Sequence, residues 1–97
     1  MRTLLTARIH TEAGNEAIRN GTMPASLKKI MDELKPECAY FTPIGGRRAI
    51  LIVFDMKESS QMPAIAEPLF EELDAEVTFQ PVMNYDDLQK GLATLQG

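Results

Sequence analysis

Residues 49–54 form an unbroken apolar run, and this run constrains the fold more than any other feature of the chain. The pair Gly45–Gly46 separates it from a second strand-like run, residues 39–42. Glycine accepts positive φ at both central positions of a tight turn, so the pattern predicts a β-hairpin. A strand with one face in water alternates apolar and polar side chains, but residues 49–54 do not alternate. Both faces of this strand therefore need cover.

Two further strands and three helical segments are predicted around the hairpin. Residues 3–9 alternate between apolar odd positions and mostly polar even positions, which is typical of a half-buried strand. A loop over residues 11–14 and a helix in two pieces follow, with Asn15 as the expected N-cap. Helical spacing of apolar residues recurs over residues 62–73. Residues 77–82 read as a strand whose Pro81 cannot donate a ladder hydrogen bond, which places that residue on an edge strand or at a strand end. Asn84 is expected to cap a last helix, residues 85–95.

The predicted order is β-α-β-β-α-β with one appended C-terminal helix, which is the ferredoxin-like arrangement of an α+β fold. We expect a single domain over residues 1–97, with a four-stranded antiparallel sheet. Right-handed crossovers place both long helices on one face of the sheet. The other face is then bare, and the third strand has large apolar side chains on both of its sides: Ile50, Ile52 and Phe54 on one, Ala49, Leu51 and Val53 on the other. A large bare apolar face favours association. Two copies that pack sheet to sheet, as a dimeric barrel, would cover it.

Composition excludes several classes of function. The net charge is −4, which argues against nucleic acid as a partner, because a phosphate backbone requires a basic patch. A single cysteine, Cys38, excludes an intrachain disulfide. No apolar run is long enough to span a membrane, and the N-terminus lacks a signal-peptide pattern, so a cytoplasmic location is expected.

The chain resembles the dimeric α+β barrel superfamily, in which two ferredoxin-like protomers face their sheets across a shared barrel. Within it, the chain looks most like a small bacterial family of uncharacterised proteins. The segments that carry the resemblance are residues 36–43, 46–48, 53–56, 63–70, 81–84 and 87–92. The wider superfamily includes cofactor-independent monooxygenases, muconolactone isomerases, haem-handling enzymes and ligand-sensing domains of regulators. A shared fold does not choose between these activities.

The candidate site follows from the alternation of the first strand. Leu5, Ala7 and Ile9 belong under the helices, so Thr6, Arg8 and His10 point into the expected barrel. Tyr40 and Gln80 would join them from neighbouring strands.

Each of these side chains has a chemistry that suits a small ligand. Arg8 would hold a carboxylate or enolate, Thr6 would add a polar contact, and Tyr40 and Gln80 would orient the ligand. His10 would move a proton at the mouth of the barrel, since histidine titrates near neutral pH. His10 with Glu12 is at most the start of a metal site, because no second histidine or cysteine cluster completes it, and the sequence indicates no cofactor.

Two classes of function remain open. The first is a homodimeric module that binds a small molecule in the barrel cavity. The second is a cofactor-independent enzyme, monooxygenase- or isomerase-like, that acts on a small aromatic or enolic substrate with His10 and Tyr40 as catalytic residues. The arrangement of His10, Arg8 and Tyr40 around one cavity would favour the second class.

Overall fold

The computed structural model describes residues 1–96 as an α+β fold built on one antiparallel sheet. Its four strands lie in the order β2-β3-β1-β4. They are β1 (Arg2–Ile9), β2 (Cys38–Ile44), β3 (Arg47–Asp55) and β4 (Ala75–Pro81). The expected position of the fourth strand is confirmed, since β4 forms one edge of the sheet and ends at Pro81. β2 forms the other edge.

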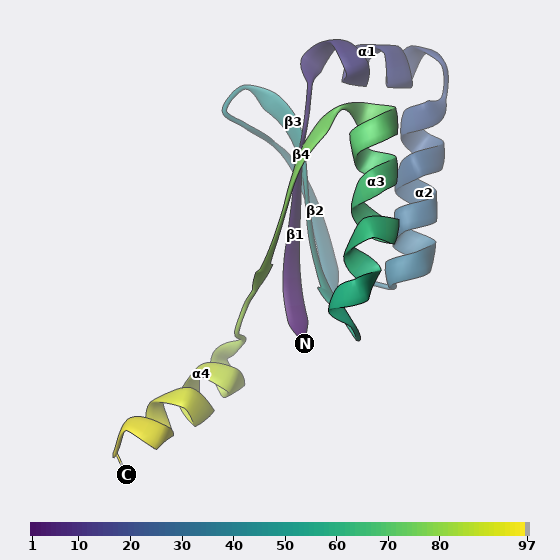
Figure 1. Ribbon diagram of the computed structural model, residues 1–97. Coiled ribbons are helices and arrows are strands. Elements are labelled where there is room, and N and C mark those ends of the chain that lie inside the picture. Colours follow the sequence, from purple (N-terminus) through teal and green to yellow (C-terminus); the bar gives the residue numbers. More distant parts are fainter. Residues whose placement is uncertain (97) are drawn as a thin grey trace.

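Three of the four α-helices pack on the same side of the sheet (Figure 1). α2 (Thr22–Leu34) and α3 (Met62–Leu73) lie side by side along it, and α1 (Thr11–Arg19) crosses the end where β1 finishes (Figure 1). A short 3-10 turn, Ser59–Gln61, precedes α3. The core lies between this helical layer and the sheet. Its largest fully buried side chains include Leu5, Ile9, Ile52, Leu69 and Leu73.

Strand register decides which side chains face the helices. β1 alternates strictly, with its odd positions buried and its even positions half-buried. β3 pairs Ile52 with Leu5, which places both under the helices, and pairs Leu51 with Thr6 on the opposite face. In the described part of the chain no helix covers that opposite face (Figure 1). We call it the uncovered face.

The Gly45–Gly46 turn joins β2 and β3 as the sequence predicts. Both glycines have positive φ, at 61° and 80°. Two consecutive positive φ values match the right-handed twist of the paired strands, and side chains at these positions would be strained. The hairpin register runs from Cys38 opposite Val53 to Ile44 opposite Arg47.

The prediction of a loop over residues 11–14 is wrong. α1 begins at Thr11, directly after β1, and its N-cap is His10 rather than Asn15. Gly14 is buried in this helix, and a Cβ there would lie only 2.9 Å from Nη1 of Arg48. The glycine therefore allows α1 to lie close to the hairpin, and that contact is invisible in the local sequence pattern.

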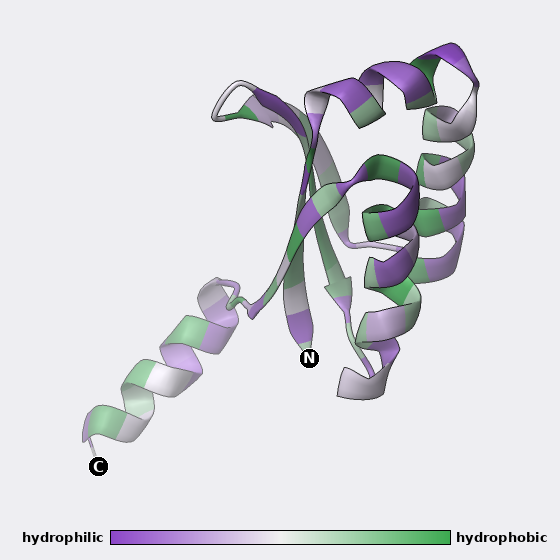
Figure 2. Cartoon of the chain, turned by 45° about the horizontal axis from the view of Figure 1, so that its top comes forward, coloured by the Kyte–Doolittle hydropathy of each residue, from purple (hydrophilic) through white to green (hydrophobic). Residues whose placement is uncertain are grey.

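The C-terminal helix, α4 (Tyr85–Ala93), leaves the body of the molecule. It continues from the end of β4 toward the side of the sheet away from α2 and α3, and a 3-10 turn, Thr94–Gln96, follows it (Figures 1 and 2). Asn84 caps it as predicted, because the Asp87 backbone N–H donates to Asn84 Oδ1 at 2.8 Å. The Asn84 backbone N–H donates in return to Asp87 Oδ2 at 3.1 Å, which completes a capping box.

None of the helices within residues 1–96 is both long enough and apolar enough to cross a membrane.

Candidate functional site

The uncovered face presents its side chains in rows that cross all four strands. The pairing register defines each row, because residues directly opposite one another point to the same face. From the hairpin end downward the rows are Thr42–Ala49–Arg8–Glu76, then Tyr40–Leu51–Thr6–Thr78, then Cys38–Val53–Leu4–Gln80. The sequence-predicted residues Thr6, Arg8, Tyr40 and Gln80 therefore share this face. Apolar Leu4, Leu51 and Val53 fill its centre.

Arg8 is the most distinctive group on this face. Its side chain is only 32% exposed, and its Nε lies 3.1 Å from Glu76 Oε2 on β4. The Nε–H is not aimed at that oxygen, so within the described residues this buried donor has no hydrogen-bond partner. Its Nη1 reaches the hairpin turn, where a Cβ on Gly45 would lie 2.9 Å away. Arg8 thus spans the end of the uncovered face with part of its donor capacity unused.

Arg2, at the opposite end of the same strand, is instead paired with two carboxylates. Its Nε donates to Glu37 Oε1 at 2.8 Å and its Nη1 donates to Asp87 Oδ2 at 2.5 Å. The hydrogen bond to Glu37 is the main cause that raises the pKa of Arg2. The pKa of Asp87 is lowered, chiefly by the backbone N–H of Asn84 and further by Arg2. Two carboxylates already neutralise Arg2, which leaves Arg8 as the better candidate for an anionic ligand.

Tyr40 and Gln80 lie on opposite edge strands of the sheet. Three strand spacings of about 4.8 Å separate their backbones by roughly 14 Å or more. Tyr40 is 67% exposed and Gln80 is also exposed. A small molecule bound at Arg8 would reach Thr6 on the same strand, and Thr78 and Glu76 on β4, more readily than it would reach Tyr40 or Gln80.

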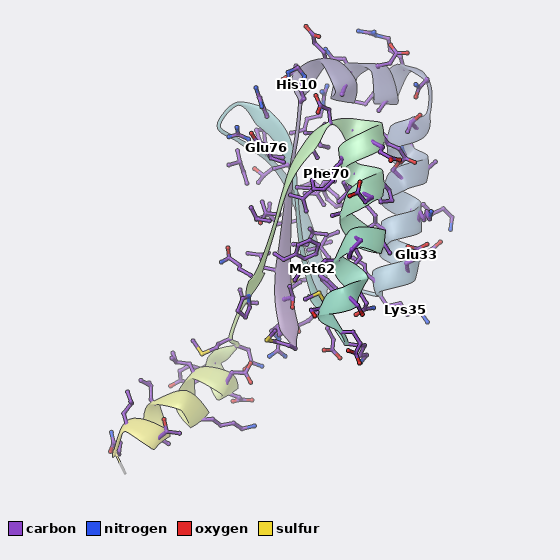
Figure 3. All side chains as sticks on the ribbon, in the orientation of Figure 1. His10, Glu33, Lys35, Met62, Phe70 and Glu76 are labelled. Atoms are coloured by element: carbon purple, nitrogen blue, oxygen red, sulfur yellow. The ribbon has the colours of Figure 1, made fainter. Side chains whose placement is uncertain are left out.

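His10 caps α1 through its backbone, whose carbonyl accepts from the Gly14 N–H at 2.9 Å. Its side chain is half-buried and makes no capping hydrogen bond. His10 and Glu76 lie at the same end of the sheet (Figure 3). Tyr40 is two strands away and further along the sheet, so one protomer does not bring the two expected catalytic residues together.

The two hairpin arginines have different surroundings. Arg48 turns toward α1, where its Nη2 donates to Asn15 Oδ1 at 3.0 Å and its side chain lies against Gly14. This arginine ties the hairpin to the helical layer. Arg47 alternates with it and belongs to the uncovered face.

Two hollows within residues 1–96 are lined by other residues than the predicted ones. One is a shallow apolar groove between α2 and α3, lined by Ile30, Leu34, Ile65 and Pro68 among others. Ser26 donates a short hydrogen bond to Glu72 beside it and so links the two helices. Another hollow lies beside the hairpin, under Phe41. Residues 1–96 contain no cluster of three or more His, Cys, Asp or Glu side chains that could hold a metal ion.

Sequence reasoning missed Glu76, the neighbour of Arg8. The fourth strand was expected to begin at Val77, but β4 begins at Ala75 and pairs Glu76 with Arg8. The alternation of Glu76 with Thr78 and Gln80 was the available signal.

Comparison of the chain with models of known protein families and with curated proteins gives no match.

Proposed function

We propose that this protein is a homodimer of ferredoxin-like protomers whose uncovered faces meet as a barrel, and that the barrel binds a small molecule bearing a carboxylate or enolate oxygen. The observation that carries the proposal is the Arg8 Nε donor, which is buried without a hydrogen-bond partner in the described residues. Buried donors are rarely left unpaired, and Glu76 is close to this one but poorly aligned, so the donor favours a better-aligned acceptor such as a ligand oxygen.

The uncovered face supports the dimer half of the proposal. The strand order 2-3-1-4 with helices on one side leaves Leu4, Leu51 and Val53 without a covering helix within residues 1–96 (Figure 1). Their burial against a second copy would stabilise the pair by about 25 cal/mol per Å² of apolar surface removed from water.

The surroundings of Arg8 support the ligand half. Thr6 lies two residues away on the same face and Thr78 lies opposite Thr6, so the row next to Arg8 offers two hydroxyl groups. A carboxylate accepts hydrogen bonds from a guanidinium fork and from hydroxyl groups. Burial between two sheets would strengthen these bonds, because charges interact more strongly where water is excluded.

The test is a titration with benzoate and with benzamide, which has the same shape but no charge. The side-chain Nε–H resonance of Arg8 is followed by NMR in the wild-type protein. We expect benzoate to shift this resonance and benzamide to leave it in place. In Arg8→Gln the benzoate affinity should fall at least tenfold, whereas in Arg47→Gln, which removes an arginine at the hairpin tip, it should change less than twofold.

Two results would overturn the proposal. One is a wild-type protein that sediments as a monomer at about 50–100 µM, a concentration at which a dimer with an interface of standard size is fully formed. The other is a dimer in which neither benzoate nor aliphatic monocarboxylates at millimolar concentration move the Arg8 resonance.

A further inference from the structure

We propose that α4 is an exchange arm, whose leucine seam packs on the start of β2 in a second copy of the chain. The leucine seam consists of Leu88 and Leu92, which are four residues apart on one face of α4, and of Leu95 in the 3-10 turn that follows. The inference rests on the dimer part of the proposed function and adds a second contact to it.

Within residues 1–96, no contact buries any residue of α4. The three seam leucines are 38%, 50% and 80% exposed. Apolar and polar positions alternate along the arm as it extends from the body (Figure 2). An isolated helix of nine residues is only marginally stable in water, so an amphipathic helix of this length requires a packing partner.

The start of the arm is held firmly. The Asn84–Asp87 capping box fixes its first turn, and Arg2 links Asp87 to Glu37. The Val82 backbone N–H also donates to the Arg2 carbonyl at 3.1 Å. These contacts come from the sheet, so they set the direction in which α4 leaves it. A loose tail would lack them.

The order of the strands indicates where the arm ends up. β4 and β2 are the two edges of the sheet. When two sheets face each other around a two-fold axis parallel to the strands, the β4 edge of each protomer lies beside the β2 edge of its partner. α4 follows β4 after three residues, 82–84, and therefore reaches the partner's β2 at the end where that strand begins.

That end of β2 is the receiving surface. Tyr40 and Phe41 are 67% and 55% exposed there, the former on the uncovered face and the latter on the other. Aromatic side chains of this kind dominate the energetics of protein interfaces. The seam and the receiving surface thus belong to the same chain, as a two-fold pair requires.

The area that a stable interface needs supports a second copy of the chain as the partner of α4. Four strands about 4.8 Å apart and about 23 Å long give a sheet footprint near 440 Å². A standard interface covers about 800 Å² on each partner. A helix of nine residues is about 14 Å long and about 10 Å wide, so one arm given and one received add roughly 280 Å² to each protomer. The sheet face alone is smaller than this standard area, whereas the sheet face and the two arm contacts together approach it.

The first experiment compares two double variants by sedimentation equilibrium. Leu88→Ser with Leu92→Ser removes the seam, and Gln89→Ser with Lys90→Ser alters the polar side of the same helix. We expect the dissociation constant of the dimer to rise at least tenfold in the first variant and to change less than twofold in the second. Circular dichroism below the dissociation constant checks that the seam variant remains folded. An unchanged dissociation constant in a folded seam variant would overturn the proposal.

The second experiment shows which copy receives the arm. Dimers are formed from one ¹³C-labelled and one unlabelled copy, and isotope-filtered spectra detect contacts between chains. Methyl protons of Leu88 and Leu92 should show contacts to the Tyr40 ring of the other copy. Contacts only within one chain, or none to Tyr40, would overturn the proposal.

The two proposals fail in distinguishable ways. A wild-type monomer removes both. A wild-type dimer that survives Leu51→Asp but is weakened by the seam variant would support the arm and contradict the barrel. The reverse pattern would support the barrel and contradict the arm.

Discussion

Arg8 and Arg2 lie on the same strand and the same face, and they differ only in their neighbours. Arg2 has two well-aligned carboxylates, whereas Arg8 has Glu76 at 3.1 Å with its Nε–H aimed elsewhere. The Glu76 side chain is largely exposed, so the pair contributes only about 0–1 kcal/mol in one protomer. A ligand carboxylate can therefore compete with Glu76 for Arg8 at small cost.

This competition gives a prediction for Glu76→Gln. The substitution keeps the size of the side chain and removes its charge, so the ligand no longer competes with a second carboxylate for the guanidinium. Benzoate affinity measured by NMR titration should rise about two- to fivefold, which corresponds to a competing interaction of up to about 1 kcal/mol. Glu37→Gln, which alters the partner of Arg2 instead, should leave the affinity unchanged. A fall in affinity in Glu76→Gln would mean that Glu76 supports the ligand rather than competes with it.

Asp55 gives a second prediction, on pH. A hydrogen bond from Lys57 and another from the Met1 amino group at 2.6 Å lower the pKa of Asp55 to about 2. Because the folded pKa lies below the unfolded value, the ionised carboxylate stabilises the fold above about pH 4, and this contribution is lost as the pH falls toward 2.

The free energy of unfolding from urea titrations checks this. At pH 6 the wild-type protein should have a larger free energy of unfolding than Asp55→Asn, and this difference should shrink steadily from pH 4 to pH 2. Asp86→Asn, at an exposed aspartate that forms no ion pair within the described residues, is the matched control and should show a smaller difference. A difference that is constant across this range would show that Asp55 gains nothing from its partners.

At the scale of elements, local patterns in the sequence were sufficient to predict the strands of the sheet but not the start of α1. Alternation in β1 and the Gly45–Gly46 turn are local signals. The first predicts β1 and its two faces, and the second predicts the hairpin of β2 and β3. The first turn of α1 has a polar sequence and an internal glycine, and the reason for Gly14 is its contact with Arg48, far along the chain. A single sequence contains no sign of that contact.

The candidate site shows the same limit. Alternation assigns Thr6, Arg8, Tyr40 and Gln80 to one face, which the register confirms. It does not give their separation across the sheet, because that depends on strand order. Strand order places Tyr40 and Gln80 on opposite edges and brings Glu76 beside Arg8.

Strand β3 offers a matched test of its two faces. Ile52 is fully buried under the helices, so Ile52→Asp places an unpaired charge in the core and should unfold the chain. Leu51 lies next to it on the uncovered face, and Leu51→Asp should leave a folded protomer that no longer dimerises. Circular dichroism and sedimentation velocity separate the two outcomes. If both variants unfold, the uncovered face is needed for folding itself; if both remain folded dimers, the face assignment of β3 is wrong.

At the scale of the whole molecule, the fold has one helical layer and one sheet, with an extended arm. Its dimensions are 56 × 27 × 18 Å, which is long for a chain of 97 residues. A chain of this size buries only about two thirds of its unfolded surface, so its own core is modest. Stability that comes from a second copy depends on protein concentration, whereas stability from the core does not.

Thermal unfolding should therefore shift with concentration. Raising the protein a hundredfold, from about 1 to about 100 µM, adds RT ln 100, or about 2.7 kcal/mol, to the stability of a dimer that unfolds to monomers. Shared between two chains, about 1.4 kcal/mol corresponds to a rise in Tm of about 5–10 °C for a domain of this size. Scanning calorimetry at both concentrations measures it, and Leu51→Asp serves as the control, whose Tm should be lower and independent of concentration. If the wild-type Tm at the two concentrations differs by less than about 1 °C, well below the expected shift, the uncovered face remains in water. The stability of the fold would then come from one chain alone.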